Sequence, residues 1–402
     1  MPSNGPFTRA LSALAGGSLT MRLAIRNTLR RKGRLALSVA LLATGGALFV
    51  TALSVREGWR AVAATALTDR HYDIEVRLTD RVPEDQLSAA ISASGAVQQL
   101  EIWGVESASV ASAGRLNVMR TYPDRGHGSF SLLGAPEDTS LVTYPIVEGR
   151  WLKPDDTDAI VLTSQAHRGS ASEVGDAFTV SIDGEPRDFT IVGIVREVGG
   201  GGAYLTKATL DQVTGGRAGQ QLRVKFDPET NPATALQSFE SALAEADIGV
   251  ERAFGIETLY GALVGHVEVP VTMLVSAAVL LATIGGLGLA SMMTISVVER
   301  TREIGVIKSI GAVPAMIVRL IVAEGAAVVA LSWIASIILA LPLIYGIDQL
   351  GSSMFGMPLP FTVSPVGSAT WFGLVAILSL VASAAPAWRA SRLVVREALA
   401  YT

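Results

Sequence analysis

Four long stretches of hydrophobic residues dominate the pattern along the chain. The first, 35–55, has 21 residues without a charge, and the second, 271–298, has 28. A third begins at Pro314 and contains two charged residues, and the fourth, 366–387, has none. About 20 apolar residues in a helix cross a hydrocarbon core of ~30 Å. The pattern therefore predicts four transmembrane helices, at 35–56, 268–298, 314–347 and 366–388.

Residues 57–267, between the first two stretches, show a different pattern. Short apolar runs alternate with turn-forming residues, and Asp183-Gly184 between two such runs is typical of a hairpin turn. Helices are expected at 84–94 and 231–246. Strands are expected at 115–122, 130–135, 159–163, 178–182, 189–195 and 222–226. The region therefore predicts an α+β domain of roughly 200 residues, the size of one or two folded lobes.

Basic residues decide the expected orientation of the helices. Six of them precede the first hydrophobic stretch between Arg22 and Arg34, and three arginines follow the last one in the tail 389–402. Lys and Arg are enriched on the cytoplasmic side of membrane proteins, and the loop 348–365 has neither. We therefore expect a multi-pass protein of the cell (inner or cytoplasmic) membrane, with cytoplasmic N- and C-termini and with 57–267 extracytoplasmic.

The first 34 residues contain a small polar lead-in and a basic segment. Arg22, Arg26 and Arg30 are spaced by four and share one helical face, as in helices that lie on a membrane surface. The alternative is that they are only the positive flank of the next helix. No cleaved signal peptide is expected, because the early charge at Arg9 is followed only by a short mixed run. We interpret 1–34 as a cytoplasmic lead-in and an interfacial helix.

Composition agrees with a membrane protein that carries a large aqueous domain. Half of the 402 residues are hydrophobic, and the mean hydropathy of +0.43 is high for a soluble protein. The net charge of −4 conceals a division: residues 57–270 contain 31 acidic and 17 basic residues, and the rest of the chain contains 5 and 15. There is no cysteine, which excludes a disulfide framework and thiolate metal sites.

The sequence contains no catalytic or nucleotide-binding motif. No G-x-x-x-x-G-K-[ST] occurs, so no P-loop can hold ATP phosphates, and the glycine run 199–202 lacks the Lys-Ser/Thr that would have to follow. Neither H-E-x-x-H nor G-x-S-x-G occurs, and the four histidines share no metal-ligand spacing. We therefore expect no catalytic residue, no metal and no cofactor in this chain, and no nucleic-acid partner.

The segment 299–313, between the second and third hydrophobic stretches, interleaves charged and apolar residues. Such a segment cannot lie in lipid, so it must face water at the cytoplasmic side, with an apolar edge left for a partner. If another chain supplies an ATP site, Arg300, Arg302 and Glu303 would pair with charges on that ATPase, and Ile304 and Ile307 would enter an apolar groove. The alternative is a plain solvated loop. The expected coupling residues are Glu299, Arg300, Arg302, Glu303, Ile304, Gly305, Ile307 and Lys308.

The second hydrophobic stretch carries a stripe of small residues. Ala278, Ala282, Gly286 and Ala290 recur every four residues, so another helix could approach this face closely. Packing within the chain is the alternative, and we favour a contact between subunits.

The third hydrophobic stretch contains Arg319 and Glu324. Ionisable residues in transmembrane helices often mark ion pathways. Arg319, however, lies within two turns of Pro314 and can extend to the membrane surface, and Glu324 lies about 8 Å deeper. We favour structural pairing near the interface over a proton or substrate role.

Several motifs resemble those of the MacB/FtsX-type ABC transporter permeases, the transmembrane subunits of the type VII ABC superfamily. In the domain 57–267 the matching stretches are Glu148–Trp151, Val174–Asp176 and Phe189–Gly193. Outside it they are Arg26–Arg31, Glu299–Gly305 with Lys308–Ala312, Ala385–Ala390 and Arg396–Leu399. The resemblance covers about residues 21–400 in the order of the family.

The resemblance implies a non-enzymatic permease that forms a dimer with a second copy or a paralogue, in contact with membrane lipid. A dimer of ABC ATPase subunits, separate or fused, would bind ATP and Mg²⁺, and its closure would move the segment 299–313, the long second helix and the outer domain together, which is mechanotransmission. This motion would export or extract a lipoprotein, peptide, lipid or drug, with a periplasmic or extracellular substrate-binding or adaptor protein as a further partner. The family also implies a MacB-like periplasmic core domain with an inserted lobe at 125–215.

Two alternatives come from other classes of protein. An FtsX-like regulator would use the outer domain to activate a cell-wall hydrolase, but about 210 residues is large for that compact domain. A membrane-bound enzyme is disfavoured because no catalytic motif occurs. Capture of a hydrolase by the outer domain would favour the regulator, and hydrolytic turnover without an ATPase would favour the enzyme.

Overall fold

The computed structural model describes residues 32–110, 130–168, 170, 172–182, 184–198, 202–355 and 361–392. Within these residues the chain forms two compact units. A helical unit contains the chain up to Gly58, Val267–Asp348 and the chain from Pro360 on, and an α+β unit contains Trp59–His266 and Gln349–Leu359. Most of the expected lead-in 1–34, the expected strand 115–122 and the motif at 396–399 lie outside the described residues.

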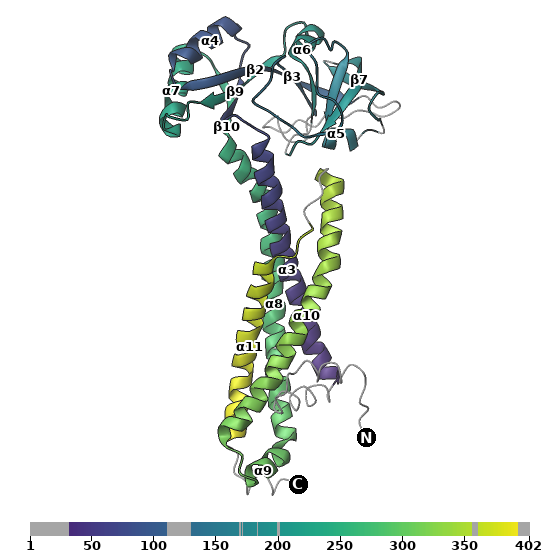
Figure 1. The fold of residues 1–402 in the computed structure, drawn as a ribbon, viewed down its shortest axis with the longest axis vertical. Helices are drawn as coiled ribbons and strands as arrows, with labels where there is room; N and C mark the ends of the chain where they lie inside the picture. Colours follow the sequence, from purple (N-terminus) through teal and green to yellow (C-terminus); the bar gives the residue numbers. More distant parts are fainter. Residues whose placement is uncertain are drawn as a thin grey trace. The chain divides into compact units, whose positions relative to one another are not determined.

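Among the described residues, four helices are long and apolar enough to cross a membrane. They are α3 (Lys32–Thr68), α8 (Ile256–Glu299), α10 (Pro314–Phe355) and α11 (Pro365–Ser391). The short helix α9 (Thr301–Ser309) lies between α8 and α10 in sequence, and α3, α8 and α11 lie side by side (Figure 1). The predicted fold class is therefore confirmed: four apolar helices, with a large α+β domain between the first and the second.

These helices extend beyond the uncharged stretches of the sequence. Helix α8 begins at Ile256, so Pro270 lies inside it and not in its first turn as predicted, and α10 continues past Pro342. An uncharged stretch marks only the part of a helix that can lie in lipid, whereas side-chain contacts can continue the helix in water. Arg56 forms an ion pair with Glu268 at 2.9 Å and so joins α3 to α8 beyond those stretches.

The small-residue stripe of α8 packs inside the chain. Ala278, Ala282 and Gly286 are buried, and Ala290 is half-buried. The helices approach closely: a Cβ atom at Gly286 would lie 3.6 Å from the Leu378 side chain of α11. The expected subunit contact on this stripe is therefore replaced by intrachain packing. The stripe could not show this by itself, because small residues allow the close approach of any helix.

The described strands of the α+β unit form one ten-stranded mixed sheet. Their bounds are β1 (Ile74–Leu78), β2 (Val97–Val110), β3 (Phe130–Ala135), β4 (Ile146–Gly149), β5 (Ala159–Thr163), β6 (Ala177–Ile182), β7 (Glu185–Val195), β8 (Ala203–Thr206), β9 (Gly219–Phe226) and β10 (Val250–Gly255). The order is β10-β1-β9-β2-β3-β8-β5-β7-β4, and β6 pairs with β2 and β7. The strand that follows α3 and the strand that precedes α8, β1 and β10, are thus hydrogen-bonded neighbours.

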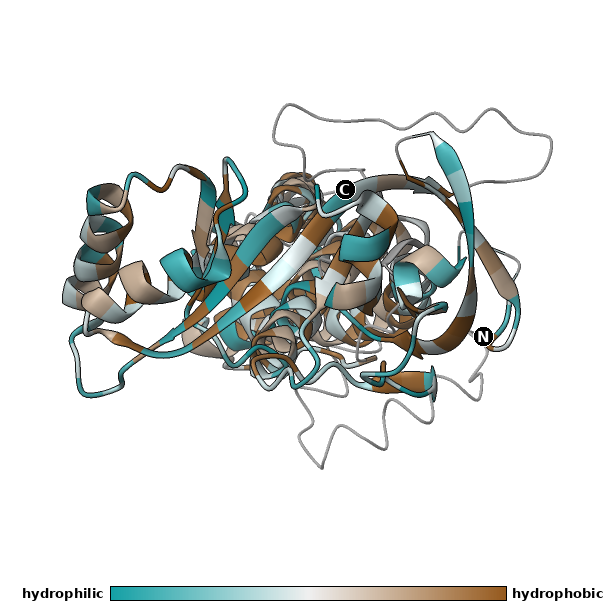
Figure 2. Ribbon diagram, turned by 90° about the horizontal axis from the view of Figure 1, so that it is seen from above, coloured by the Kyte–Doolittle hydropathy of each residue, from teal (hydrophilic) through white to brown (hydrophobic). Residues whose placement is uncertain are grey.

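Helices cover two separate hydrophobic cores of this sheet. The helices are α4 (Glu84–Ala93), α5 (Ser164–Arg168), α6 (Lys207–Thr214) and α7 (Pro232–Glu245). Leu87 of α4 and Phe239 of α7 pack on Val224 in one core. The other core contains Leu132, Ile160 and Leu210 of α6. Its buried members, apart from Ala108 and Ala218, lie between 125 and 215, where the family implied an inserted lobe. Figure 2 shows that the strands of this sheet contain both hydrophobic and hydrophilic residues.

The predicted helices at 84–94 and 231–246 and the hairpin at Gly184 are confirmed, as are five of the expected strands. The pattern did not predict β1, β2, β4, β8 or β10, and the burial of β4 and β8 explains why those two were missed. Every described side chain of β4 is exposed and every one of β8 is buried. Neither strand therefore has the alternation by which a half-buried strand is recognised.

Two glycines explain part of the family motif at 148–151. A Cβ atom at Gly193 of β7 would lie 2.1 Å from the carbonyl oxygen of Arg150, and one at Gly149 would lie 2.3 Å from the carbonyl oxygen of Val192. Gly149 also has a φ of +73°, which non-glycine residues rarely adopt. Glycine at both positions lets the end of β4 lie directly against β7.

A buried ion pair connects the segment after α3 to the end of β7. Arg70 donates to Glu197 Oε1 at 3.1 Å and to the carbonyl of Val198 at 3.0 Å. Tyr144 and Tyr204 donate to the same carboxylate, at 3.2 and 2.5 Å. Burial and then the negative charge of Glu197 raise the pKa of both tyrosines, so they stay protonated and continue to donate. The buried carboxylate of Glu197 thus accepts hydrogen bonds from three side chains, those of Arg70, Tyr144 and Tyr204.

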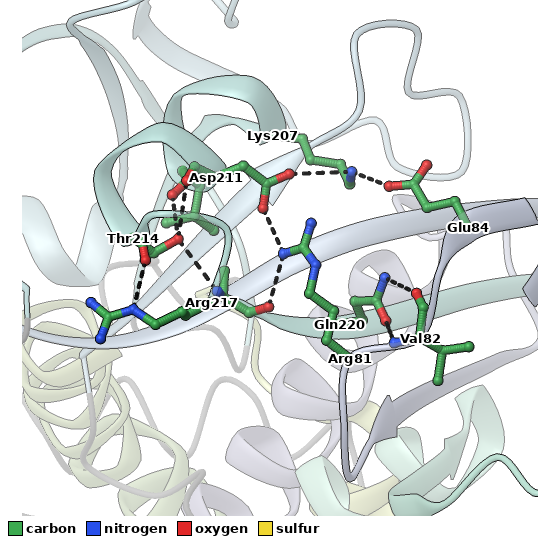
Figure 3. A network of polar contacts seen from close by, with 10 residues as sticks. Arg81, Val82, Glu84, Lys207, Asp211, Thr214, Arg217 and Gln220 are labelled. Carbon is green, nitrogen blue, oxygen red and sulfur yellow. Dashed lines mark hydrogen bonds and ion pairs between the residues drawn. The ribbon is translucent and has the colours of Figure 1, made fainter.

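A second polar network joins the segment before α4 to α6 (Figure 3). Arg81 Nη1 lies 2.8 Å from Asp211 Oδ1. Lys207 Nζ lies 3.5 Å from Asp211 Oδ2 and also pairs with Glu84. Burial alone would raise the pKa of Asp211, but the hydrogen bond from Arg81 and the positive charges of Lys207 and Arg81 outweigh it and lower that pKa.

The lowered pKa of Asp211 predicts a pH-dependent contribution to stability. A carboxylate of this kind stabilises the folded state above its ordinary pKa of about 3.9, and the stabilisation is lost as pH falls through the folded-state pKa. We expect Asp211→Asn to unfold at a lower temperature than the wild type at neutral pH, and the two transitions to converge below about pH 4. Scanning fluorimetry of the full chain in detergent micelles measures this. The control is Glu240→Gln on the exposed side of α7, and a constant difference for Asp211→Asn down to about pH 3 would contradict the assignment.

Candidate coupling site around helix α9

The expected hinge segment forms a short amphipathic helix with defined ends. Helix α8 ends at Glu299, and Arg300 has φ −108° and ψ 16°, which interrupts the helix before α9 begins at Thr301. Gly311, with a φ of +102°, follows α9, and glycine adopts this conformation without strain. Pro314 then occupies the first position of α10, where its missing N–H is not needed.

One side of α9 is packed into the hydrophobic core of the helical unit. Ile304 is only 5% exposed and belongs to the cluster that contains Met293, Ile317 and Ile321. Gly305, next to it, is buried as well. Helix α9 is therefore fixed to α8 and α10 through side chains that face inwards.

Polar contacts hold both ends of α9. At its start, Arg300 Nε lies 2.9 Å from Glu303 Oε2, and Arg300 Nη1 lies 2.6 Å from Glu324 Oε1 on α10. At its end, Lys308 Nζ donates to the carbonyl of Ser391 on α11 at 2.7 Å. A displacement of α9 would therefore act on α10 at one end and on α11 at the other.

The other side of α9 and the turn after it expose apolar side chains. Val306 is 43% exposed, Ile310 is 82% exposed and Val313 is 60% exposed. We call these three residues the apolar stripe. Arg302 and Glu303 lie on the same exposed part of the segment, and Glu299 is exposed at the end of α8.

The structure changes the expected role of several coupling residues. Ile304 cannot enter a groove of a partner while it is buried in its own chain, so the expectation for Ile304 is wrong, and Ile307 is only 36% exposed. Arg300, expected to pair with an ATPase, is bound to Glu303 and Glu324.

The three residues of the apolar stripe were not among the coupling residues expected from the sequence. Val306, Ile310 and Val313 follow one another at spacings of four and three residues. This spacing is the helical signal that could have identified them.

Arg319 and Glu324, the two charged residues of α10 expected within the membrane, are in different environments. Glu324 is 4% exposed and forms an ion pair with Arg300, and the structural role favoured for it over a proton or substrate role stays a prediction. Arg319 is exposed. The partner of Glu324 lies 24 positions away in the sequence, which is why spacing along α10 could not identify it.

Two family models match the chain in sequence order. The MacB-like periplasmic core domain matches residues 35–242, and the FtsX-like permease C-terminal domain matches residues 275–395. The first match alone covers more than half of the chain. The second match includes α9, the apolar stripe and Glu324.

Known proteins are similar to the chain over long stretches. A macrolide export ATP-binding/permease protein, MacB, of Bdellovibrio bacteriovorus is 25% identical over 324 residues, which are 75% of this chain and 48% of that protein. An uncharacterized ABC transporter permease of Methanocaldococcus jannaschii is 24% identical over 223 residues, 52% of this chain and 54% of that protein. The chain thus spans about half the length of these two relatives.

Among solved structures, the periplasmic region of MacB from Actinobacillus actinomycetemcomitans covers 49% of this chain and is itself covered to 95%, at 18% identity and a TM-score of 0.33. Family membership rests on the two family models, whose order along the chain agrees with the order of the α+β domain and the later helices. The chain belongs to the MacB/FtsX-type family of ABC transporter permeases.

Proposed function

We propose that this chain is the membrane subunit through which an ABC ATPase drives movement of the α+β domain. In this proposal the termini and α9 face the cytoplasm, and the α+β domain lies outside the cell membrane. ATP and Mg²⁺ bind to the partner ATPase. Closure of the ATPase dimer displaces α9, and the helices carry the displacement to the other side of the membrane.

The observation that carries the proposal is the apolar stripe of Val306, Ile310 and Val313. It lies on a segment that contains Arg302 and Glu303 and that connects two membrane-crossing helices, so it faces water and not lipid. Exposed apolar side chains in water are a marker of an interaction surface, and a short amphipathic helix binds well in an apolar groove. We propose that the apolar stripe binds in an apolar groove of the ATPase. Arg302 then pairs with an acidic group at the rim of that groove.

The anchoring of α9 supports transmission of force as well as docking. Arg300 is held by Glu324 of α10, and Lys308 is held by the Ser391 carbonyl of α11. Ile304 belongs to the hydrophobic core of the helical unit. Because α9 is tied to two long helices, a push on α9 would move them instead of bending a loose loop.

A second permease subunit would contact a different surface of α8 from the small-residue stripe. Met273, Leu280 and Leu287 are between 66% and 68% exposed, and their spacing of seven residues places them on one helical face. This face would contact either lipid or a second copy or paralogue. We further propose that the substrate is of the drug, peptide, lipid or lipoprotein class, since the relatives named MacB are macrolide export proteins.

The test is retention of the ATPase after charge is introduced on the stripe. We expect Ile310→Asp, Val306→Asp and Arg302→Glu each to reduce co-purification of the co-expressed cognate ATPase with the permease from membranes. The first should have the largest effect, because Ile310 is the most exposed of the three stripe residues. Docking by an amphipathic helix depends on burying its apolar anchors, and a carboxylate at an anchor must be desolvated on binding.

A matched control and a topology measurement complete the test. Val147→Asp changes an exposed apolar residue of the α+β domain and should leave the ATPase bound. Because the chain has no cysteine, Ile310→Cys and Val147→Cys can each be labelled singly in sealed vesicles. They should react from opposite sides. Wild-type levels of ATPase with Ile310→Asp, or labelling of both cysteines from one side, would contradict the proposal.

A further inference from the structure

The residue between α8 and α9, Arg300, connects three elements at a single point. Its Nε atom is 2.9 Å from Glu303 of α9, and its Nη1 atom is 2.6 Å from Glu324 of α10. The two carboxylates differ in environment: the Glu303 side chain is 53% exposed and the Glu324 side chain only 5%. Arg300 therefore has one partner that can exchange with water and one that cannot.

The buried half of this contact resists separation. Glu324 lies in an apolar helix, and a buried carboxylate without its cation would retain a charge removed from water. Glu303, in contrast, can leave Arg300 and be hydrated with little loss, as exposed ion pairs contribute little. The contact from Arg300 to α10 is thus the fixed one, and the contact to α9 is the one that can change.

A cavity lies beside the fixed contact and behind α9. Its volume is about 80 Å³, and its lining includes Ile304 and Ile307 of α9, Leu320 and Ile321 of α10, and both members of the pair Arg300–Glu324. The cavity is partly open to the surface, since Met316 and Ile307 in its lining are exposed. It leaves room into which the side chains of Ile304 and Ile307 can move as α9 turns.

We propose that the Arg300–Glu324 pair is a pivot about which α9 turns when the ATPase moves it, and that the cavity receives Ile304 and Ile307 in the turned position. The inference rests on the proposed function, because it assumes that a partner displaces α9. Glu324 and Arg300 are positioning residues in this account, since they hold the start of α9 at a constant distance from α10. The expected displacement is a rotation of α9 into the void.

The test measures the movement of α9 separately from the binding of the ATPase. The chain contains no cysteine, so spin labels can be placed on Ser309→Cys and Ala326→Cys, two exposed positions on α9 and α10. The distance between the labels is measured by electron–electron double resonance in nanodiscs that contain the bound cognate ATPase, with and without Mg·ATP. We expect the wild-type background to show a change in distance on addition of Mg·ATP.

Two variants then distinguish a pivot from an ordinary structural contact. Leu320→Phe fills the cavity and should suppress the ATP-dependent distance change while the ATPase remains bound. Glu324→Gln removes the fixed charge and should broaden the distance distribution even without ATP, and the exchange Arg300→Glu with Glu324→Arg should narrow it again. In Leu320→Phe and in Glu324→Gln, the coupling between ATP turnover and the movement of α9 should fall at least about fivefold. Fivefold is the lower end of typical coupling between two sites.

The outcomes separate the two proposals. If Leu320→Phe and Glu324→Gln both keep the wild-type distance change with the ATPase bound, the pivot is wrong and the docking proposal stands. If the ATPase does not bind the wild type, or binds it and Mg·ATP changes no distance, the proposed function fails and the pivot with it. Weaker ATPase binding in Leu320→Phe would also count against the pivot, since the cavity would then support the docking surface.

Discussion

Arg70→Met is expected to destabilise the α+β domain by about 3–5 kcal/mol, the usual cost of leaving one member of a buried ion pair without its partner. The side chains of Arg70 and Glu197 are only 5% and 8% exposed. Methionine conserves most of the side-chain volume. The loss of stability therefore measures the removal of the charge and its hydrogen bonds, and not the creation of a cavity. Chemical denaturation of the full chain in detergent micelles, followed by tryptophan fluorescence, measures the change.

Two comparisons make this result specific. Arg187→Met breaks a pair with Glu185 whose side chains are 49% and 73% exposed, and it should cost no more than about 1 kcal/mol. The double variant Arg70→Met with Glu197→Leu should recover much of the loss, because no buried charge is then left alone. Equal effects of Arg70→Met and Arg187→Met would show that the buried pair contributes nothing beyond a surface contact.

Gly46→Leu is expected to prevent stable packing of α3, α10 and α11, with a loss of about 3 kcal/mol, the upper end of the usual cost of overpacking. A Cβ atom at Gly46 would lie 2.2 Å from Trp371 Nε1 and 2.5 Å from Ser336 Cβ. Both neighbours are fully buried, so neither can move away into solvent. The gain of up to about 1 kcal/mol in helix propensity on replacing glycine does not offset this overlap.

The matched control is Gly373→Leu on α11, where a Cβ atom would meet nothing within 4 Å. It should be neutral or slightly stabilising, because it has the same gain in helix propensity without the overlap. The measurement is the fraction of the chain that stays monodisperse in size-exclusion chromatography after heating in micelles. Retention of wild-type monodispersity by Gly46→Leu would mean that α3 does not pack tightly against Trp371.

The coupling segment could be identified from the sequence as a candidate, but the orientation of its side chains could not. The alternation of charged and apolar residues between 299 and 313 indicates a water-facing amphipathic segment. Periodicity alone does not say which of two apolar sets, Ile304 with Ile307 or Val306 with Ile310, faces the bundle. The start of α9 relative to α8 decides this, and the irregular backbone at Arg300 sets that start.

The stripe on α8 and the Arg300–Glu324 pair show the same limit at longer range. Four small residues at a spacing of four indicate that some helix can approach closely, and the fold decides that α3 and α11 do so. An acid within an apolar helix indicates that some cation must be near, and the fold supplies Arg300 from 24 positions away. In both cases the local pattern specifies a requirement and the tertiary arrangement chooses the residue that meets it.

The sequence by itself determined the four apolar helices, the α+β domain between the first two and the family to which the chain belongs. These depend on hydrophobic periodicity and length, which act locally and are visible in any short window. Only the tertiary structure decided which residues of α9 are exposed, which cation neutralises Glu324 and which helices cover the small-residue face. Burial and ion pairing depend on residues far apart in the chain, and no local window contains both members of such a contact.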